Sequence, residues 1–206
     1  LDYDKIHYFK ITSINSGGES KKSENISFRT LPLPPSEFSA STLNKSSILL
    51  KWNLSKGAEG YRIYRAKSSS GPFKMIAANW NSTIFIDQGL HKETVYYYKI
   101  SGIYRKYVES EKTKSVAKGT KFYAPQTLRM NQIKANTIKL EWDMVTNATA
   151  YHIFRDGVQI WSGNNNKFTD LNLKPNTLYS YSIAAYSYYS GIGDKSIPKQ
   201  VFTLMG

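Results

Sequence analysis

The sequence predicts an all-β protein, built from antiparallel β-sandwiches of about seven strands each. Three observations lead to this prediction. Tyrosine, with 16 residues, and β-branched residues are abundant, and such side chains suit a pleated, half-buried surface. Stretches that alternate apolar and polar residues are separated by turns rich in Gly, Ser and Asn. Finally, one pattern recurs after 90 residues, and a repeat of that length indicates a whole domain.

The repeat aligns residues 31–120 with residues 121–206. At a shift of 90 residues, Trp52 matches Trp142 and Arg65 matches Arg155. The match resumes at a shift of 83 residues, and the difference falls between SSSGPFK and DGVQ, where a loop can shorten without disturbing a core. We therefore expect one domain at 31–120 and a second at 121–206. The repeated aromatic residues that we expect in the cores are Trp52, Trp142, Tyr61, Tyr151, Tyr96, Tyr179, Tyr98 and Tyr181.

The strands follow from alternation. SILLKWNL places Ile48, Leu50 and Trp52 on one face, and TIKLEWDM repeats that arrangement. In TVYYYKISG, Tyr96 and Tyr98 alternate with a tyrosine that faces the other way. No segment shows a sustained 3.6-residue period with caps, so we expect few helices.

These residues resemble a fibronectin type III domain. A proline at the start of the domain, a tryptophan on the second strand and a Tyr-x-Ile nine residues later occur in both segments. The later pattern Leu-x-Pro-x-Thr-x-Tyr-x-Tyr-x-Ile is complete from Leu173 to Ile183, whereas residues 90–100 lack its proline. The resemblance covers about 31–120 and 121–206. It implies that Tyr96 is a corner tyrosine, whose hydroxyl bonds back to the backbone.

The first thirty residues carry part of the same pattern. IHYFKITSINSGGES is similar to VYYYKISGIYRKYVES, with His7 at the corner position, and ENISFRT reads as a closing strand. We expect residues 1–30 to be the C-terminal strands of a truncated fibronectin type III-like domain. Because a two-stranded piece is marginally stable alone, either its partner strands are missing from this chain or the ribbon packs on the next domain.

The sequence predicts no enzyme, no cofactor and no metal site. Cysteine is absent, which excludes disulfides and thiol catalysis. His7, His91 and His152 lie on separate segments, without a nucleophile motif beside any of them. Asp87 and Asp170 occupy equivalent positions in separate domains, so we expect them in turns rather than as a catalytic pair.

Candidate ligand-binding residues are aromatic and border polar loops. Exposed rings can bind the apolar face of a sugar, while small polar neighbours bond its hydroxyl groups. The alternative is partial burial at a sandwich edge or packing along a hairpin. The candidates are Trp80, Trp161, Tyr186, Tyr188, Tyr189, Tyr104 and Arg105.

The chain has a formal net charge of +13, and residues 31–120, with 14 basic and 6 acidic residues, contribute +8. The lysines are dispersed, which is typical of a solvated surface and, as the alternative, of attraction to an anionic cell-wall polymer. Nucleic acid is disfavoured, because no helical reading element or Arg-rich strip accompanies the charge. No run of 18 apolar residues occurs, so we expect no membrane span, and we expect a monomer.

These observations predict a non-catalytic spacer or interaction module. The resemblance implies that it positions neighbouring catalytic or binding domains of the same polypeptide. The Lys, Asn, Ile and Tyr bias favours a bacterial exported or cell-surface protein, located outside the cell. The alternative is an adhesion module that binds a polysaccharide, an anionic cell-wall polymer or a host surface protein through exposed aromatics. The sequence does not decide between the spacer and the adhesion module.

Overall fold

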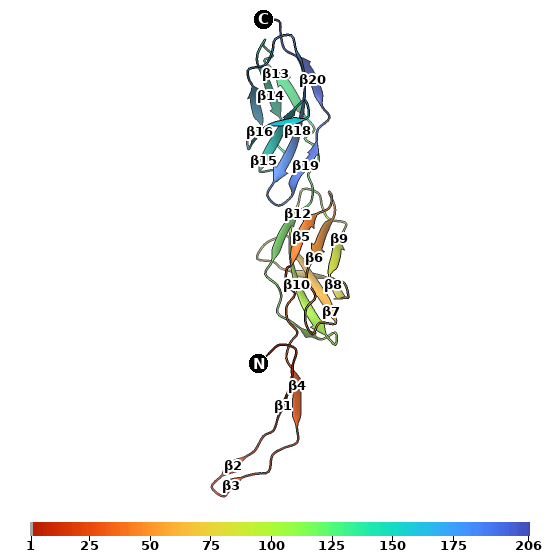
Figure 1. The fold of residues 1–206 in the computed structure, drawn as a ribbon, viewed down its shortest axis with the longest axis vertical. Coiled ribbons are helices and arrows are strands. Elements are labelled where there is room, and N and C mark those ends of the chain that lie inside the picture. Colours follow the sequence, from red (N-terminus) through yellow and green to blue (C-terminus); the bar gives the residue numbers. More distant parts are fainter. Residues whose placement is uncertain (1) are drawn as a thin grey trace. The chain divides into compact units, whose positions relative to one another are not determined.

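The computed structural model describes residues 2–206. Leu1, the first residue of the predicted 1–30 segment, lies outside the described residues. Residues 2–206 contain twenty strands and no helix, which confirms the all-β prediction (Figure 1). They contain no helix that could cross a membrane.

The chain divides into two compact units. Residues 2–39, Lys51–Phe85 and Tyr97–Val116 form the first, and Ala40–Leu50, Ile86–Tyr96 and Ala117–Gly206 form the second.

The N-terminal strands form a ribbon. They are β1 (Ile6–Phe9), β2 (Ile14–Asn15), β3 (Gly18–Glu19) and β4 (Ile26–Arg29). β1 pairs antiparallel with β4, and β2 pairs with β3. The rings of Phe9 and Phe28 stack on one face, with centroids 5.1 Å apart, yet these side chains are 43% and 45% exposed. This apolar face is therefore uncovered within residues 2–206.

Residues 39–119 form two antiparallel sheets. Strands β5 (Ser39–Thr42), β6 (Ile48–Lys51) and β9 (Ile84–Asp87) form the order β5-β6-β9. Strands β7 (Gly60–Ala66), β8 (Lys74–Trp80), β10 (Val95–Tyr104) and β11 (Val108–Glu109) form the order β11-β10-β7-β8, and β12 (Val116–Gly119) pairs with β10. Trp52 and Tyr61 are buried and pack edge to face, with ring centroids 5.2 Å apart.

Residues 128–202 repeat this topology. Strands β13 (Leu128–Asn131), β14 (Ile138–Trp142) and β17 (Lys167–Asp170) form one sheet. Strands β16 (Val158–Gly163), β15 (Ala150–Arg155), β18 (Leu178–Ser187) and β19 (Gly191–Lys195) form the other, and β20 (Lys199–Phe202) pairs with β18. Leu140 and Trp142 of the first sheet share one buried cluster with Tyr151 and Ile183 of the second. Two sheets that share such a core are packed face to face, as in a β-sandwich (Figure 1).

The sequence repeat extends to individual hydrogen bonds. The Tyr96 hydroxyl accepts the backbone N–H of His91 at 3.0 Å, and the Tyr179 hydroxyl accepts that of Lys174 at 3.0 Å. Both are tyrosine corners of the kind that the resemblance implies. Tyr96 is buried, whereas Tyr179 is half-buried.

Candidate functional site

The two candidate tryptophans, Trp80 at the end of β8 and Trp161 in β16, are packed against aromatic side chains of their own sandwiches. The Trp80 indole N–H donates to the Ile84 carbonyl at 2.9 Å, and its ring meets Phe85 edge-on at 5.1 Å between centroids. The Trp161 ring lies 6.0 Å from that of Trp142 and 5.3 Å from that of Phe168. Both indoles are half-buried, so intramolecular packing already uses much of each ring.

The tyrosines of the β18–β19 hairpin differ in exposure. Tyr186 is half-buried and its ring tilts against His152, with centroids 5.2 Å apart. Tyr188 is 81% exposed and packs edge to face with Tyr189 at 5.4 Å. The Tyr189 carbonyl accepts the Gly119 N–H at 2.9 Å. Of the three candidate tyrosines, Tyr188 presents the most open ring.

The β10–β11 hairpin presents cations and a free aromatic ring. Its turn consists of Arg105, Lys106 and Tyr107, all exposed, and Tyr107 is 86% exposed. The Tyr104 ring is half-buried, with the guanidinium of Arg29 at 4.6 Å and that of Arg105 at 5.2 Å from its centroid. These cations occupy the Tyr104 ring, so Tyr107 rather than Tyr104 is the free ring at this turn.

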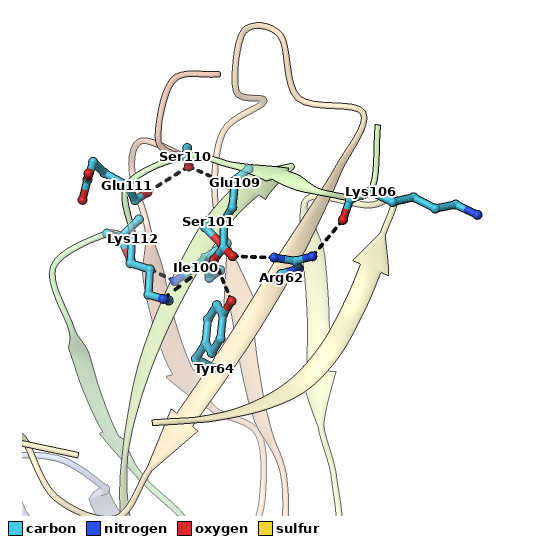
Figure 2. Close-up of polar contacts among 11 residues, drawn as sticks. Arg62, Tyr64, Ile100, Ser101, Lys106, Glu109, Ser110, Glu111 and Lys112 are labelled. Atoms are coloured by element: carbon cyan, nitrogen blue, oxygen red, sulfur yellow. Dashed lines mark hydrogen bonds and ion pairs between the residues drawn. The ribbon is translucent and has the colours of Figure 1, made fainter. Parts of the chain in front are cut away.

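A hydrogen-bonded cluster lies directly behind that turn, centred on Glu109 of β11 (Figure 2). Glu109 Oε1 accepts the hydroxyls of Ser101 at 2.5 Å and Tyr64 at 2.6 Å. Glu109 Oε2 accepts Arg62 Nη1 at 2.5 Å. Lys112 Nζ lies 3.9 Å from Oε1 and 4.6 Å from the centre of the Tyr64 ring. One carboxylate thus ties together β7, β10, β11 and the segment after β11.

The electrostatics fix the protonation state of this cluster. Burial alone would raise the pKa of the Glu109 carboxyl, but hydrogen bonds from Ser101, Tyr64 and Arg62 hold that pKa below its ordinary value. Burial and the hydrogen bond to Glu109 raise the pKa of the Tyr64 hydroxyl. At neutral pH, Glu109 is therefore ionised and Tyr64 is a donor. Since Ser101 is fully buried and already bonded to Glu109, the cluster positions strands rather than presenting a nucleophile.

Arg62 connects the cluster to the turn. Its Nη2 donates to the Lys106 carbonyl at 2.8 Å, while its Nη1 contacts Glu109, and Figure 2 shows the guanidinium between these two groups. The Oε2 of Glu59 accepts the backbone N–H of Arg105 at 2.9 Å. The turn is thus held from behind by one guanidinium and one carboxylate.

The second sandwich lacks most of this cluster although it keeps the strand pairing. Ile103 pairs with Glu109 across the hairpin, and Tyr186 pairs with Ile192 at the equivalent place. Four of the five members change together: Tyr64 becomes Phe154, Ser101 becomes Ala184, Glu109 becomes Ile192 and Arg62 becomes His152. The fifth, Lys112, is kept as Lys195, whose Nζ lies 3.6 Å from the centre of the Phe154 ring. The fold therefore does not require the cluster. Sequence reasoning missed it, although the coordinated loss of polar groups at repeat positions was the available signal.

A different buried carboxylate stabilises the second sandwich. Asp170, expected in a turn, is instead 6% exposed at the end of β17. It accepts Arg155 Nη1 on both oxygens at 3.0 and 2.9 Å, and the Tyr181 hydroxyl at 2.7 Å. Burial, and then the hydrogen bond to Asp170, raise the pKa of Tyr181 far above its ordinary value. This is a structural ion pair within the sandwich.

A hollow of about 520 Å³ in the second unit is lined by residues that include Lys92, Tyr123 and Asp143. The Nζ atoms of Lys45 and Lys92 lie 4.2 and 4.4 Å from the centre of the Tyr123 ring. These ammonium groups compete with any ligand for the ring. Among residues 2–206, no group of three or more His, Cys, Asp or Glu side chains is placed to hold a metal ion.

No family model matches the chain. Part of it is similar to three characterised enzymes. Over 68 residues, 33% of this chain and 14% of the relative, it is 31% identical to a poly(3-hydroxybutyrate) depolymerase of Ralstonia pickettii. Over 74 residues, 36% of this chain and 6% of the relative, it is 37% identical to an amylopullulanase of Thermoanaerobacterium saccharolyticum. Over 65 residues, 30% of this chain and 5% of the relative, it is 32% identical to an α-amylase of Niallia circulans. The chain thus spans 14% or less of the length of each of these relatives.

Solved structures are also similar to the chain. An Fn3-like protein from Clostridium thermocellum is 30% identical, with a TM-score of 0.42, and the match covers 45% of this chain and 97% of that one. A segment of two fibronectin type III domains from chicken tenascin is 19% identical, with a TM-score of 0.47, covering 82% of this chain and 99% of that one.

Proposed function

Because the chain belongs to the fibronectin type III family, we propose that it is a non-catalytic extracellular module of a larger bacterial protein, where it spaces and orients neighbouring catalytic or binding domains. The observation that carries this proposal is that the chain matches only small parts of enzymes with different activities. Segments of 65–74 residues match small parts of a depolymerase, an amylopullulanase and an α-amylase. Each match covers only 5–14% of the enzyme's length, so most of each enzyme lies outside the part that resembles this chain, which supports an accessory role.

The segments before and after the first sandwich suit such a role. TLPLPPSE contains three prolines, which restrict the chain to extended conformations. The last residue of β12, Gly119, and the segment that follows it are held by defined contacts. The Thr42 hydroxyl donates to the Gly119 carbonyl at 2.7 Å, and the Lys121 N–H donates to the Asn44 carbonyl at 3.0 Å. A linker held in this way favours a fixed spacing over a flexible tether.

The experiment that tests the non-catalytic part uses the chain alone. It is incubated with insoluble poly(3-hydroxybutyrate) and with insoluble starch, and released product and bound protein are measured. We expect no product above a boiled control and no saturable binding. Product formation that scales with the concentration of the chain would refute the proposal.

The second candidate function is a binding module for a carbohydrate or a host surface protein. The observation that favours it is the free aromatic ring at each hairpin tip, Tyr107 and Tyr188, at a position where a sandwich presents its loops to solvent. Its test is retention on bacterial cell-wall preparations. Retention that Tyr188→Ala abolishes, and that persists in about 0.5 M salt, where the Debye length falls below roughly 5 Å, would support this function.

A further inference from the structure

We propose that the Arg105–Lys106 turn is a recognition tip for a carboxylate-bearing polysaccharide, and that Arg62 and Glu109 are the residues that position it. This inference rests on the second candidate function, the binding module.

The turn is strained in a way that the chain could have avoided. Arg105 has a φ of 48° and Lys106 a φ of 63°, in the left-handed region that Gly and Asn normally fill. In the matching hairpin of the second sandwich, Tyr188 and Tyr189 hold these two positions without a positive φ, and the left-handed residue is Gly191, with a φ of 73°, at the position of Val108. Strained residues persist where the surrounding structure enforces them and commonly mark functional sites. The strain here places two cationic side chains side by side at the tip.

The supporting contacts hold the backbone and leave both cations exposed, with the Arg105 guanidinium 5.2 Å from the centre of the Tyr104 ring. Arg62 bonds the carbonyl of Lys106, and Glu59 bonds the N–H of Arg105 (Figure 2 shows the Arg62 contact). Neither the Arg105 guanidinium nor the Lys106 ammonium has an acidic partner within residues 2–206. Glu109 fixes Arg62, so its carboxylate acts on the tip through that guanidinium. The turn is thus preorganised, with its charges directed to solvent.

The second sandwich provides an internal comparison. At its hairpin, the positions of Arg105 and Lys106 hold Tyr188 and Tyr189, and the position of Glu109 holds Ile192. The tip cations and the network that supports them are therefore absent together from one hairpin and present together in the other. This joint occurrence indicates that they work as one unit, because a network needed only for folding would recur with the fold.

The chemistry at the tip selects the ligand. A guanidinium pairs with a carboxylate through two parallel hydrogen bonds, and an ammonium adds a second positive charge. The exposed Tyr107 ring offers a face to the apolar C–H side of a pyranose. An acidic peptide could pair its carboxylates with the two cations, but it has no pyranose ring to pack against Tyr107. The net charge of +8 on residues 31–120 attracts an extended polyanion. A uronic-acid polysaccharide satisfies all of these features.

The test is calorimetric titration of the full chain with de-esterified polygalacturonate at low salt. Arg105→Gln and Lys106→Gln remove one tip charge each, and we expect each to weaken binding about fivefold, the factor of one good surface charge pair. Lys167→Gln removes an exposed charge of β17 and serves as the matched control, with affinity expected to stay within about twofold. Lys106→Gly relieves the strained φ and should raise the Tm while lowering the affinity, a combination that a purely structural turn would not show.

Positioning is tested by Glu109→Gln, which leaves both tip cations in place. We expect weaker binding together with faster amide hydrogen exchange at residues 105–107. Equal losses in the tip variants and in Lys167→Gln would overturn the proposal in favour of diffuse charge. Tighter binding to polyglutamate than to polygalacturonate would overturn it in favour of an acidic protein partner, and no binding by the native chain would overturn it outright. In each case the spacing role would stand, because that role requires no ligand.

Discussion

Replacing Glu109 by isoleucine copies the second sandwich at one position and should be strongly destabilising. The substitution removes the acceptor for three donors, on Ser101, Tyr64 and Arg62. Ser101 is fully buried, so its hydroxyl would lose its partner without gaining water. A buried group left unpaired costs about 1–3 kcal/mol, and the Glu109 side chain is itself 21% exposed, which weakens its ion pair with Arg62. We expect a total loss of about 3 kcal/mol in the free energy of unfolding.

The triple substitution Tyr64→Phe, Ser101→Ala and Glu109→Ile should restore most of that stability. It removes both hydroxyl donors together with their acceptor, as the second sandwich does at Phe154 and Ala184. Replacing both partners of a hydrogen bond by apolar groups can be nearly neutral, so we expect the triple variant within about 1 kcal/mol of the native chain.

The assay must report on this part of the chain alone. Native-state hydrogen exchange of amides in β7 and β10 does so, because amides of β15 and β18 are measured separately in the same sample. The expected result is an opening free energy that falls in the single variant and recovers in the triple one, with the β15 and β18 amides unchanged. A single variant that costs under about 1 kcal/mol, or a triple variant at least as unstable as the single one, would refute the reasoning.

Three further predictions concern Glu109, the two tyrosine corners and Trp161. The folded-state pKa of Glu109 is below its ordinary value of 4.5, so its stabilising contribution is present above about pH 4.5 and is lost as the pH falls through the folded pKa. Urea denaturation of the native chain across pH 3–6 should show this loss of stability. In Glu109→Gln, this pH dependence should be absent. Tyr96→Phe and Tyr179→Phe each delete a corner hydroxyl that accepts a backbone N–H, and each should lower the free energy of unfolding by about 1–2 kcal/mol in urea denaturation. An unchanged unfolding midpoint would show that the corner hydroxyl does not stabilise the fold. Trp161→Ala removes a ring packed on Trp142 and should cost about 2–4 kcal/mol without altering any binding to cell walls; a loss of binding at full stability would instead make Trp161 a ligand residue.

Residue alternation was sufficient to predict the core. Trp52 and Trp142 alternate with polar neighbours on their strands, and both are buried, because a strand with one covered face must place every second residue inside. Tyr96 and Tyr98 are 2% and 0% exposed for the same reason, while Tyr97, which faces the other way, is only half-buried.

The polar clusters could not be predicted in the same way. Glu109 meets Arg62 and Tyr64 only because β10 pairs with β11 along one edge and with β7 along the other, in a register that brings the three strands' side chains together. Asp170 was expected in a turn because aspartate favours turns, but its ion pair with Arg155 keeps it buried. Pattern predicts which face a residue occupies, whereas contacts between strands distant in sequence depend on three-dimensional register.

The spacing role is tested most directly by an exchange of linkers. The chain is placed between the catalytic domain and the starch-binding domain of a starch-degrading enzyme, and the ratio of activity on insoluble starch to activity on a soluble substrate is measured. The account predicts that a Gly/Ser linker of 206 residues, the length of this chain, lowers this ratio and leaves the soluble activity unchanged. An equal ratio with the two linkers would contradict the claim that this chain positions its neighbours.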